Sequence, residues 1–356
     1  MSHMLGEILR GQPGPVLVTG NTGFKGSWLT LLLETLGVPQ VGYALEPEKN
    51  SLFRFLALDR RVYCKFGDVR EETSVEKEFL IHEPSVVIHM AAQSLVLKSY
   101  EEPRETFDTN IMGTINVLQA ARRVKSVKVV LVITTDKVYR NDGFGRRFIE
   151  TDSLMGKDPY SASKVATESV CVAWNQLNLH SSGPKILVAR AGNVIGGGDT
   201  NLDRLIPDIV RSLQNQKTLQ IRNMTSTRPW QHVLDPLVGY IKYIEAELGR
   251  TNPPPALNFG PREASKNVAY VVQSAQKHFG NQLKYEILPS KTTPQEAHTL
   301  DLDSSLAETS LAWAPMWDQD LALDRTFDWW KKALQQEATF EDCCKADIRS
   351  YFEGES

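Results

Sequence analysis

VLVTGNTGFKGSWL, residues 16–29, sets the architecture of this chain. Its first four residues are apolar or β-branched and predict a buried strand, whereas the run that begins at Trp28 predicts a helix. Gly20, Gly23 and Gly26 lie between the two elements at three-residue spacing. This arrangement suits a dinucleotide pyrophosphate, because glycines let backbone approach phosphate and a helix N-terminus supplies free N–H groups.

The glycine spacing alone is a weak signal, because it is G-x-x-G-x-x-G rather than the G-x-G-x-x-G of many dehydrogenases. A glycine-rich turn that binds nothing is the alternative. The following elements favour binding, since strands keep alternating with helices. Strands are expected at 38–45, 62–66, 85–93, 127–135 and 185–189, and helices at 72–82, 103–125 and 159–178. Six alternations predict an α/β fold, a Rossmann-type doubly wound parallel sheet.

The alternation ends after about residue 192, which predicts a second, discontinuous part. Helices are expected near 204–216, 264–279 and 320–335. We expect a dinucleotide-binding domain at 12–191, with returning segments at roughly 229–260. Residues 192–228 and 261–356 are expected to form a smaller, C-terminal substrate-binding domain.

Composition points to a globular protein that binds small molecules. The 356 residues are 41% hydrophobic and 23% charged, and the net charge is −3, which gives no electrostatic basis for binding nucleic acid or an anionic membrane. No run is long and apolar enough to cross a bilayer, and no signal segment is evident, so a cytoplasmic location is expected. The four cysteines lack metal-ligand spacing, so we expect free thiols and no metal.

Several strand ends carry candidate cofactor contacts. The acidic residue that often ends the second strand and holds the adenosine ribose is missing at Ala44, and the first acid is Glu46. The choice between NAD and NADP therefore stays open, and loose binding is expected. Asp68 follows the third strand and either caps the next helix or binds the adenine amine, the cap being favoured. Small residues after the fourth strand, Ala91 and Ala92, leave room for a ligand.

Two groups of residues suggest acid–base chemistry. Tyr160 and Lys164 are four apart on a predicted helix, so they share a face, and a lysine ammonium beside a phenol favours the phenolate, a general base. Thr135, Asp136 and Lys137 follow the fifth strand at the ligand-binding edge of such a sheet. The alternatives are a solvated helix face for the first group, and a turn cap and a surface charge for the second.

Six blocks of this sequence resemble the nucleotide-sugar dehydratases of the extended short-chain dehydrogenase family. They are residues 20–29 (GNTGFKGSWL), 134–139 (TTDKVY), 158–164 (DPYSASK), 189–199 (ARAGNVIGGGD), 228–233 (RPWQHV) and 296–298 (EAH). The resemblance extends roughly from residue 15 to residue 330. The Asp-Lys pair after Thr135 and the blocks at 189–199 and 228–233 are more specific to this subgroup than the glycine turn and the Tyr-x-x-x-Lys spacing.

The resemblance implies dehydration of a nucleotide sugar, with CDP-glucose favoured, on enzyme-bound NAD. Tyr160, assisted by Lys164, would take the 4-hydroxyl proton, while Thr135 bonds the same oxygen. Lys137 would remove the C5 proton and Asp136 would protonate the departing 6-hydroxyl, giving a 4-keto-6-deoxy sugar. A lysine base needs a lowered pKa, so the role of Lys137 is the most demanding.

The resemblance also assigns binding residues. Expected cofactor contacts, besides Tyr160 and Lys164, are Gly20, Thr22, Gly23, Phe24, Gly26, Asp68, Val69, Ala91, Ala92, Gln93, Asn110 and Thr134. Expected substrate contacts are Asn193, Arg204, Arg228 and His232. A plain helix-face charge is as good an interpretation for Arg204, and His232 and His298 suit a structural or rim position better than catalysis.

Two other functions remain open at this stage. A nucleotide-sugar 4-epimerase shares fold, NAD, tyrosine and lysine, but has small residues where Asp136 and Lys137 stand. A catalytically idle, NAD-binding regulatory relative would lose the tyrosine or the lysine, and this chain keeps both. The family resemblance further implies a homodimer or homotetramer joined by the helices at 103–125 and 159–178. The expected apolar seam is Ile111, Ile115, Leu118, Val165, Val172 and Ala173.

Overall fold

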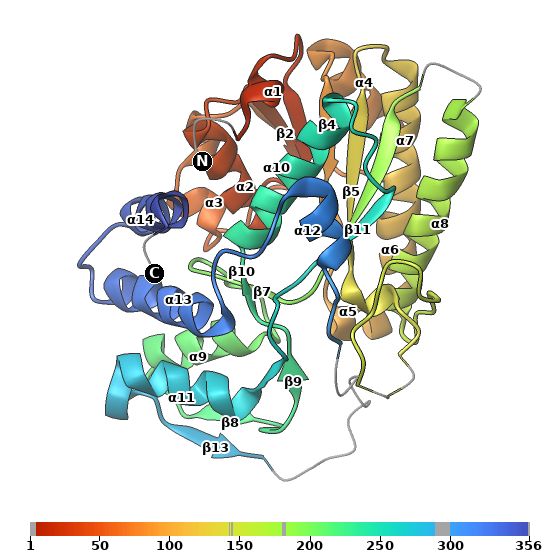
Figure 1. Ribbon diagram of the computed structural model, residues 1–356. Helices are drawn as coiled ribbons and strands as arrows, with labels where there is room; N and C mark the ends of the chain where they lie inside the picture. The colour runs from red at the N-terminus through yellow and green to blue at the C-terminus, as the bar shows by residue number, and fades with distance from the viewer. Residues whose placement is uncertain (1–4, 142, 144, 180–182, 289–299, 355–356) are drawn as a thin grey trace.

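The computed structural model describes residues 5–141, 143, 145–179, 183–288 and 300–354, so the block at 296–298 with His298 lies outside the described residues. A seven-stranded parallel sheet runs through the molecule in the order β11-β6-β5-β4-β1-β2-β3 (Figure 1). Its strands are β1 Val16–Thr19, β2 Gln40–Ala44, β3 Cys64–Phe66, β4 Val86–His89, β5 Val129–Thr135, β6 Lys185–Ala191 and β11 Ala256–Phe259. The predicted doubly wound parallel sheet is confirmed.

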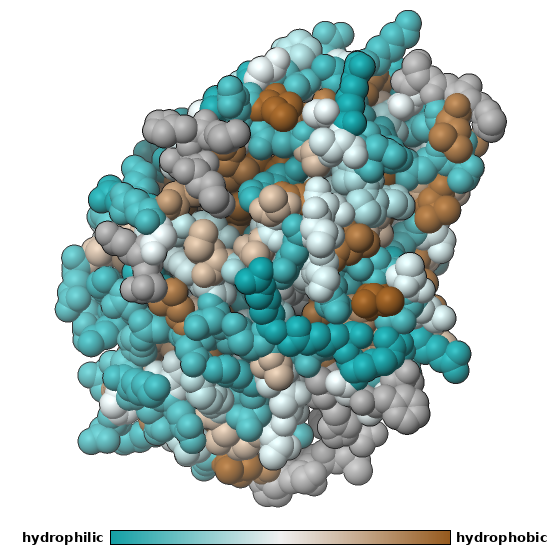
Figure 2. Space-filling view, in the orientation of Figure 1, coloured by the Kyte–Doolittle hydropathy of each residue, from teal (hydrophilic) through white to brown (hydrophobic). Residues whose placement is uncertain are grey.

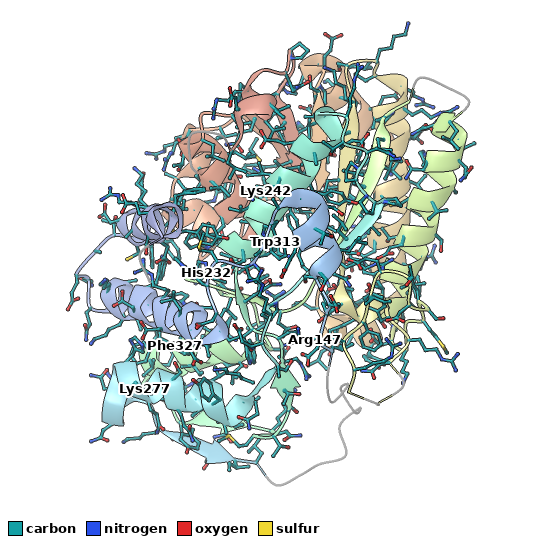
Figure 3. The ribbon with its side chains drawn as sticks, in the orientation of Figure 1. Arg147, His232, Lys242, Lys277, Trp313 and Phe327 are labelled. Carbon is teal, nitrogen blue, oxygen red and sulfur yellow. The ribbon has the colours of Figure 1, made fainter. Side chains whose placement is uncertain are left out.

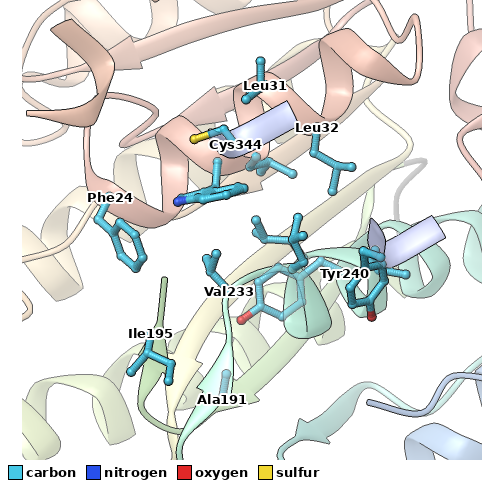
Figure 4. Close-up of a cluster of buried hydrophobic side chains, with 14 of the residues drawn as sticks. Phe24, Leu31, Leu32, Ala191, Ile195, Val233, Tyr240 and Cys344 are labelled. Atoms are coloured by element: carbon cyan, nitrogen blue, oxygen red, sulfur yellow. The ribbon is translucent and has the colours of Figure 1, made fainter. Parts of the chain in front are cut away.

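Helices cover both faces of the sheet. Because successive residues of a strand point to opposite faces, each strand contributes side chains to two cores. Leu17 packs in the core under α4 (Glu72–His82), α7 (Gly113–Arg123) and α8 (Pro159–Leu179). Its neighbours Val16 and Val18 pack in the other core, under α2 (Phe24–Thr35) and α10 (Leu234–Leu248). Figure 4 shows this second core, where side chains of α2 and α10 meet.

Three elements differ from the sequence-based expectation. The helix expected at 103–125 is divided into α6 (Pro103–Phe107), a π-helical turn (Asp108–Met112) and α7. The seventh strand, β11, was not expected, because it is short and follows the proline-rich stretch 251–255. Helix α10 was also not expected, since Pro236 lies in its first turn, a position that helices tolerate.

The smaller part lies at the carboxyl ends of the strands. It contains α9 (Leu205–Gln214), α11 (Val268–Phe279) and α13 (Gln319–Leu334), close to the three expected helices. Helix α12 (Ser305–Leu311) packs instead on α10 and β11, and α14 (Phe340–Glu353) contacts both α13 and α3 (Leu52–Phe55). Three two-stranded sheets lie at this end of the molecule: β7 (Val194–Ile195) with β10 (Gln231–His232) of the returning segment, β9 (Thr227–Arg228) with β12 (Lys266–Asn267), and β8 (Leu219–Ile221) with β13 (Tyr285–Ile287). Figure 1 shows α9, α11 and β13 as a group beyond the end of the sheet. We use the word lid for the predicted substrate-binding part, residues 192–228 and 261–356, to which this group belongs.

Two features are absent from the described residues, a membrane-spanning helix and a metal-binding cluster. None of their helices has the length and apolar character that a membrane span needs. Among the same residues, no cluster of three or more histidine, cysteine or acidic side chains could hold a metal ion.

Candidate active site

A cavity of about 1700 Å³ lies between the carboxyl edge of the sheet and the lid. It begins at the loop after β2, passes the glycine turn, and continues along α9 to β8. Apart from Asn110 and His232, the predicted cofactor, catalytic and substrate residues all line it. The wall also includes residues 217–223, which the sequence reading missed although their strand is flanked by polar residues.

The glycine turn has the shape that a dinucleotide requires. Gly20 has a φ of +74°, and a Cβ on it would lie 2.7 Å from the backbone N of Ala91. A Cβ on Gly26 would lie 2.2 Å from the carbonyl oxygen of Gly20. Gly23 is exposed to the cavity and begins α2 without a side-chain cap, so the first-turn N–H groups remain available to an anion. The residues present therefore fit a dinucleotide pyrophosphate.

The adenosine end of the cavity departs from one expectation. No acid stands at Ala44, and Glu46, an exposed residue, pairs with Arg54 at 3.4 Å. Asp68 does not cap α4: its Oδ1 accepts the backbone N–H of Arg70 at 2.9 Å, and its Oδ2 pairs with the Arg70 guanidinium at 2.6 Å. The favoured cap interpretation is wrong because Arg70, two residues away, occupies the carboxylate.

Asn110 lies behind the cavity wall. It is 1% exposed, its Oδ1 accepts the N–H of Gln93 at 2.9 Å, and its Nδ2 donates to Ser163 Oγ at 2.8 Å. Direct cofactor contact by Asn110 is therefore a wrong prediction, because these bonds consume its amide. Asn110 instead joins the strand end that carries Gln93 to the helix that carries Tyr160 and Lys164.

The catalytic candidates converge on one wall of the cavity. Asp136 is 2% exposed, and its Oδ1 accepts a hydrogen bond from Thr135 Oγ1 at 2.9 Å. The second oxygen, Oδ2, has no partner within the described chain. Lys164 Nζ donates to the carbonyl of Ile133 at 3.1 Å, one helical turn from Tyr160. Elements β5 and α8 thus hold a carboxyl, a phenol and an ammonium around a common space.

Burial dominates the acid–base properties of these groups. It raises the pKa of Asp136, which favours the protonated acid. It lowers the pKa of Lys164 to about 8. It also raises the pKa of Tyr160 to about 12, against a hydrogen bond from Thr135 that lowers it. The phenolate expected beside Lys164 is therefore not favoured in the free protein, because loss of solvation outweighs nearby charge.

A buried ion pair supports this wall from behind. The Arg190 guanidinium binds Glu168 at 2.5 Å, and both side chains are 5% exposed. Glu168 Oε1 also accepts the hydroxyl of Thr134 at 2.7 Å, and Arg190 Nη1 donates to Tyr139 Oη at 2.7 Å. Thr134 lines the cavity, but its hydroxyl already donates to Glu168 behind the wall.

The lid contributes Asn193, Arg204 and Arg228 to the cavity. Arg204 precedes α9 rather than lying on its solvated face, and it pairs with the buried Asp199 at 3.1 Å. Asp199 comes from the glycine-rich block at 189–199, so this block positions a guanidinium toward the cavity. Guanidinium groups bind phosphate in a bidentate geometry.

His232 lies elsewhere, inside the molecule between the sheet domain and α13 (Figure 3). It has no exposed surface, and its ring packs against Trp28 and Trp317, with centroids 5.7 and 4.6 Å away. Burial lowers its pKa to about 3, so the ring is neutral. The prediction that His232 binds substrate is wrong, because its side chain has no exposed surface and does not line the cavity.

Comparison with known proteins places the chain among sugar-nucleotide enzymes. The family model described as GDP-mannose 4,6 dehydratase matches residues 17–326. A CDP-glucose 4,6-dehydratase of Salmonella typhimurium is 41% identical over 346 residues, 94% of this chain and 95% of that protein. A probable dTDP-glucose 4,6-dehydratase of Sinorhizobium fredii is 26% identical, over 88% of this chain and 92% of that protein.

Solved structures with lower identity share the fold. A dTDP-glucose 4,6-dehydratase of Bacillus anthracis in complex with NAD has a TM-score of 0.75 at 21% identity, covering 90% of this chain and 98% of that chain. A UDP-glucose 4-epimerase of Thermus thermophilus in complex with NAD has a TM-score of 0.76 at 23% identity, covering 90% and 99%.

The fold and the cavity define an enzyme of the extended short-chain dehydrogenase class. This class contains both dehydratases and epimerases, so the fold alone does not separate them. The chain belongs to the GDP-mannose 4,6-dehydratase family. The predicted resemblance to nucleotide-sugar dehydratases is confirmed.

Proposed function

We propose that this protein is an NAD-dependent 4,6-dehydratase that converts CDP-glucose into CDP-4-keto-6-deoxyglucose and water. The observation that carries the proposal is the cavity wall on which Asp136 and Lys137 stand with Tyr160 and Lys164. An epimerase needs no acid at C6, whereas this wall holds the buried carboxyl of Asp136, whose pKa is raised by burial, a shift toward the protonated form that a general acid requires. The 41% identity to a CDP-glucose 4,6-dehydratase supports the choice of nucleotide.

Three residues of this wall exchange protons with the sugar, and two others support them. Tyr160 accepts the proton of the sugar 4-hydroxyl, with Thr135 bound to the same oxygen. Because burial disfavours the phenolate in the free protein, the positive nicotinamide of NAD+ would have to join Lys164 in stabilising it. The resulting 4-ketone acidifies C5, and Lys137 removes the C5 proton. Asp136 then donates its proton to the 6-hydroxyl, which leaves as water.

NAD, when bound, would supply the carrier for the hydride that leaves C4 and is delivered to C6, and the protonated Lys137 would return a proton to C5. The glycine turn with its residues Gly20, Gly23 and Gly26 would hold the pyrophosphate, and the pocket lined by Asp68 and Val69 would hold the adenosine. We assign cofactor binding to residues 12–191 with roughly 229–260. Sugar-nucleotide binding belongs to the lid, where Arg204 and Arg228 line the cavity.

The experiment that tests this function is a substrate comparison. The purified protein with NAD+ is incubated separately with CDP-, dTDP-, UDP- and GDP-glucose and with GDP-mannose, and each sugar nucleotide is analysed by mass spectrometry. Loss of one water from CDP-glucose, faster than from the others, is the expected result. Epimerisation at constant mass, detected by chromatography, would contradict the proposal.

Cofactor dependence gives a second prediction. Because no acid stands at Ala44, the grip on the adenosine ribose is weak, and purified protein should lose cofactor. Activity should fall after charcoal treatment and return on adding NAD+, with NADP+ less effective. Full activity of charcoal-treated protein without added nucleotide would refute this.

Assembly gives a third prediction, which refines the expected seam. Leu118 is 1% exposed inside the core and is unavailable, which corrects that part of the prediction. Val172, Leu177 and Leu179 of α8 are 62%, 47% and 72% exposed, and Figure 2 shows apolar residues along the edge that α8 occupies. We propose a homodimer or homotetramer joined through this edge. Val172→Arg should yield monomers in analytical ultracentrifugation, whereas Ile287→Arg on β13, 59% exposed, should not.

A further inference from the structure

Lys25 is a cavity residue that the proposed reaction does not use. It is the second residue of α2, between Gly23 and Gly26 of the glycine turn, and its side chain forms part of the cavity wall. Its Nζ donates a hydrogen bond to Tyr240 Oη at 3.3 Å and lies 5.6 Å from the centre of the same ring. Tyr240 belongs to the core of α2 and α10 (Figure 4) and has no exposed surface.

The surroundings of Lys25 are short of negative charge. Within the described residues, no carboxylate comes within ion-pair distance of its Nζ, and the partner it has is an uncharged phenol. The charged groups that influence it are Arg204 before α9, Lys164 of α8 and Asp136 after β5. Of these three, Asp136 is a buried acid that favours its proton. Arg204 is paired with Asp199, whereas Lys25 faces the cavity without a carboxylate partner among the described residues.

We propose that the Lys25 ammonium binds the diphosphate of a nucleotide in this cavity. A diphosphate supplies the missing negative charge, and Lys25 lies beside the turn whose N–H groups suit phosphate. The diphosphate could belong to the cofactor or to the sugar nucleotide. Both of these ligands come from the proposed function, so the inference rests on it. The inference assigns the side chain of Lys25, in addition to the backbone of the glycine turn, to ligand binding.

Lys25 is expected to gain a proton when a diphosphate binds. Burial, with Arg204 and Lys164 nearby, lowers the pKa of Lys25 to about 7, although Asp136 opposes this. An approaching diphosphate raises the pKa of a neighbouring amine, so binding above neutral pH should be accompanied by proton uptake at Lys25. Lys164, with a pKa of about 8, contributes to the same uptake, so the contribution of Lys25 is the difference between wild type and variant.

The test measures binding rather than turnover. ADP-ribose and CDP serve as diphosphate probes, and AMP and CMP as matched probes without the diphosphate; all are titrated calorimetrically at pH 8 in two buffers of different ionisation heat. Lys25→Met should weaken ADP-ribose, CDP or both by ~10- to 100-fold, the range of a charge-assisted hydrogen bond, and lower proton uptake. Lys25→Arg should restore most of the affinity, and Lys49→Met, an exposed lysine outside the cavity, should change nothing.

The four probes distinguish the cofactor diphosphate from the sugar-nucleotide diphosphate, and they distinguish failure of this inference from failure of the proposed function. Weakening of ADP-ribose assigns the contact to the cofactor diphosphate, and weakening of CDP assigns it to the sugar nucleotide. Unchanged binding of both, or equal weakening of AMP and CMP, overturns the inference even if CDP-glucose is dehydrated. A wild-type protein that binds neither diphosphate probe overturns the inference and the proposed function together. Lys25→Gln replaces Lys25→Met if the latter does not fold.

Discussion

The Asp136→Asn protein is expected to oxidise its substrate at C4 and then to stop. The substitution keeps the shape and the hydrogen bond from Thr135 but removes the proton that the 6-hydroxyl needs. A positioned acid accelerates its step by about 10²–10⁴-fold, so water loss should slow by that factor. In a single turnover the 4-keto sugar and reduced cofactor should accumulate together. The hydrogen at C5 should exchange with solvent deuterium, and the mass of the sugar nucleotide should show no loss of water.

Tyr160→Phe provides the matched comparison, because it removes the base of the first step and leaves the acid in place. It should yield no ketone, no exchange at C5 and no reduced cofactor. Wild-type water loss by Asp136→Asn would show that the acid is misassigned. Failure of Asp136→Asn to form the ketone, with substrate bound, would place Asp136 at C4 and favour an epimerase.

Arg190→Met is expected to destabilise the fold by about 3–5 kcal/mol, the usual result of removing one partner from a buried ion pair. Glu168 would keep its charge at 5% exposure with only the hydroxyl of Thr134 as a partner. The bond from Arg190 to Tyr139 would also be lost. Urea unfolding followed by tryptophan fluorescence measures the change.

Two controls isolate the buried charge. Arg262→Met breaks the pair with Glu308, but Arg262 is 59% exposed, so the expected cost is below about 1 kcal/mol. The double variant Glu168→Leu/Arg190→Met removes both charges and should be more stable than Arg190→Met alone. Equal loss of stability in Arg190→Met and Arg262→Met would contradict this account.

The sheet was predictable because local pattern and global fold agree over residues 16–191. Apolar runs such as 127–135 belong to strands buried on both faces, and the glycine turn marks the first crossover. Strand β11 was harder to recognise, since it has four residues and gains its identity only by pairing with β6. Its register, Ala256 beside Val188, is a long-range property that no short window contains.

The residues of the cavity were predictable where they follow a strand end, as Thr135 and Asp136 do. His232 and Asn110 were misplaced, because a motif gives position along the chain but not the direction of a side chain. Lys25 was overlooked for a different reason, because residues 20–29 were interpreted only through their glycines. Its exposure to the cavity depends on α10 and α9, which lie about two hundred residues further along the chain.

The interleaved path of the chain limits how such a protein is modified. Between two stretches of the lid, residues 229–260 return to the sheet as α10 and β11. No single cut in the sequence therefore releases the lid as a transplantable module, and exchanging it between relatives requires at least two crossovers that both preserve the contacts of β11 with β6. Point substitutions along the cavity wall avoid this constraint and are the simpler way to change substrate choice.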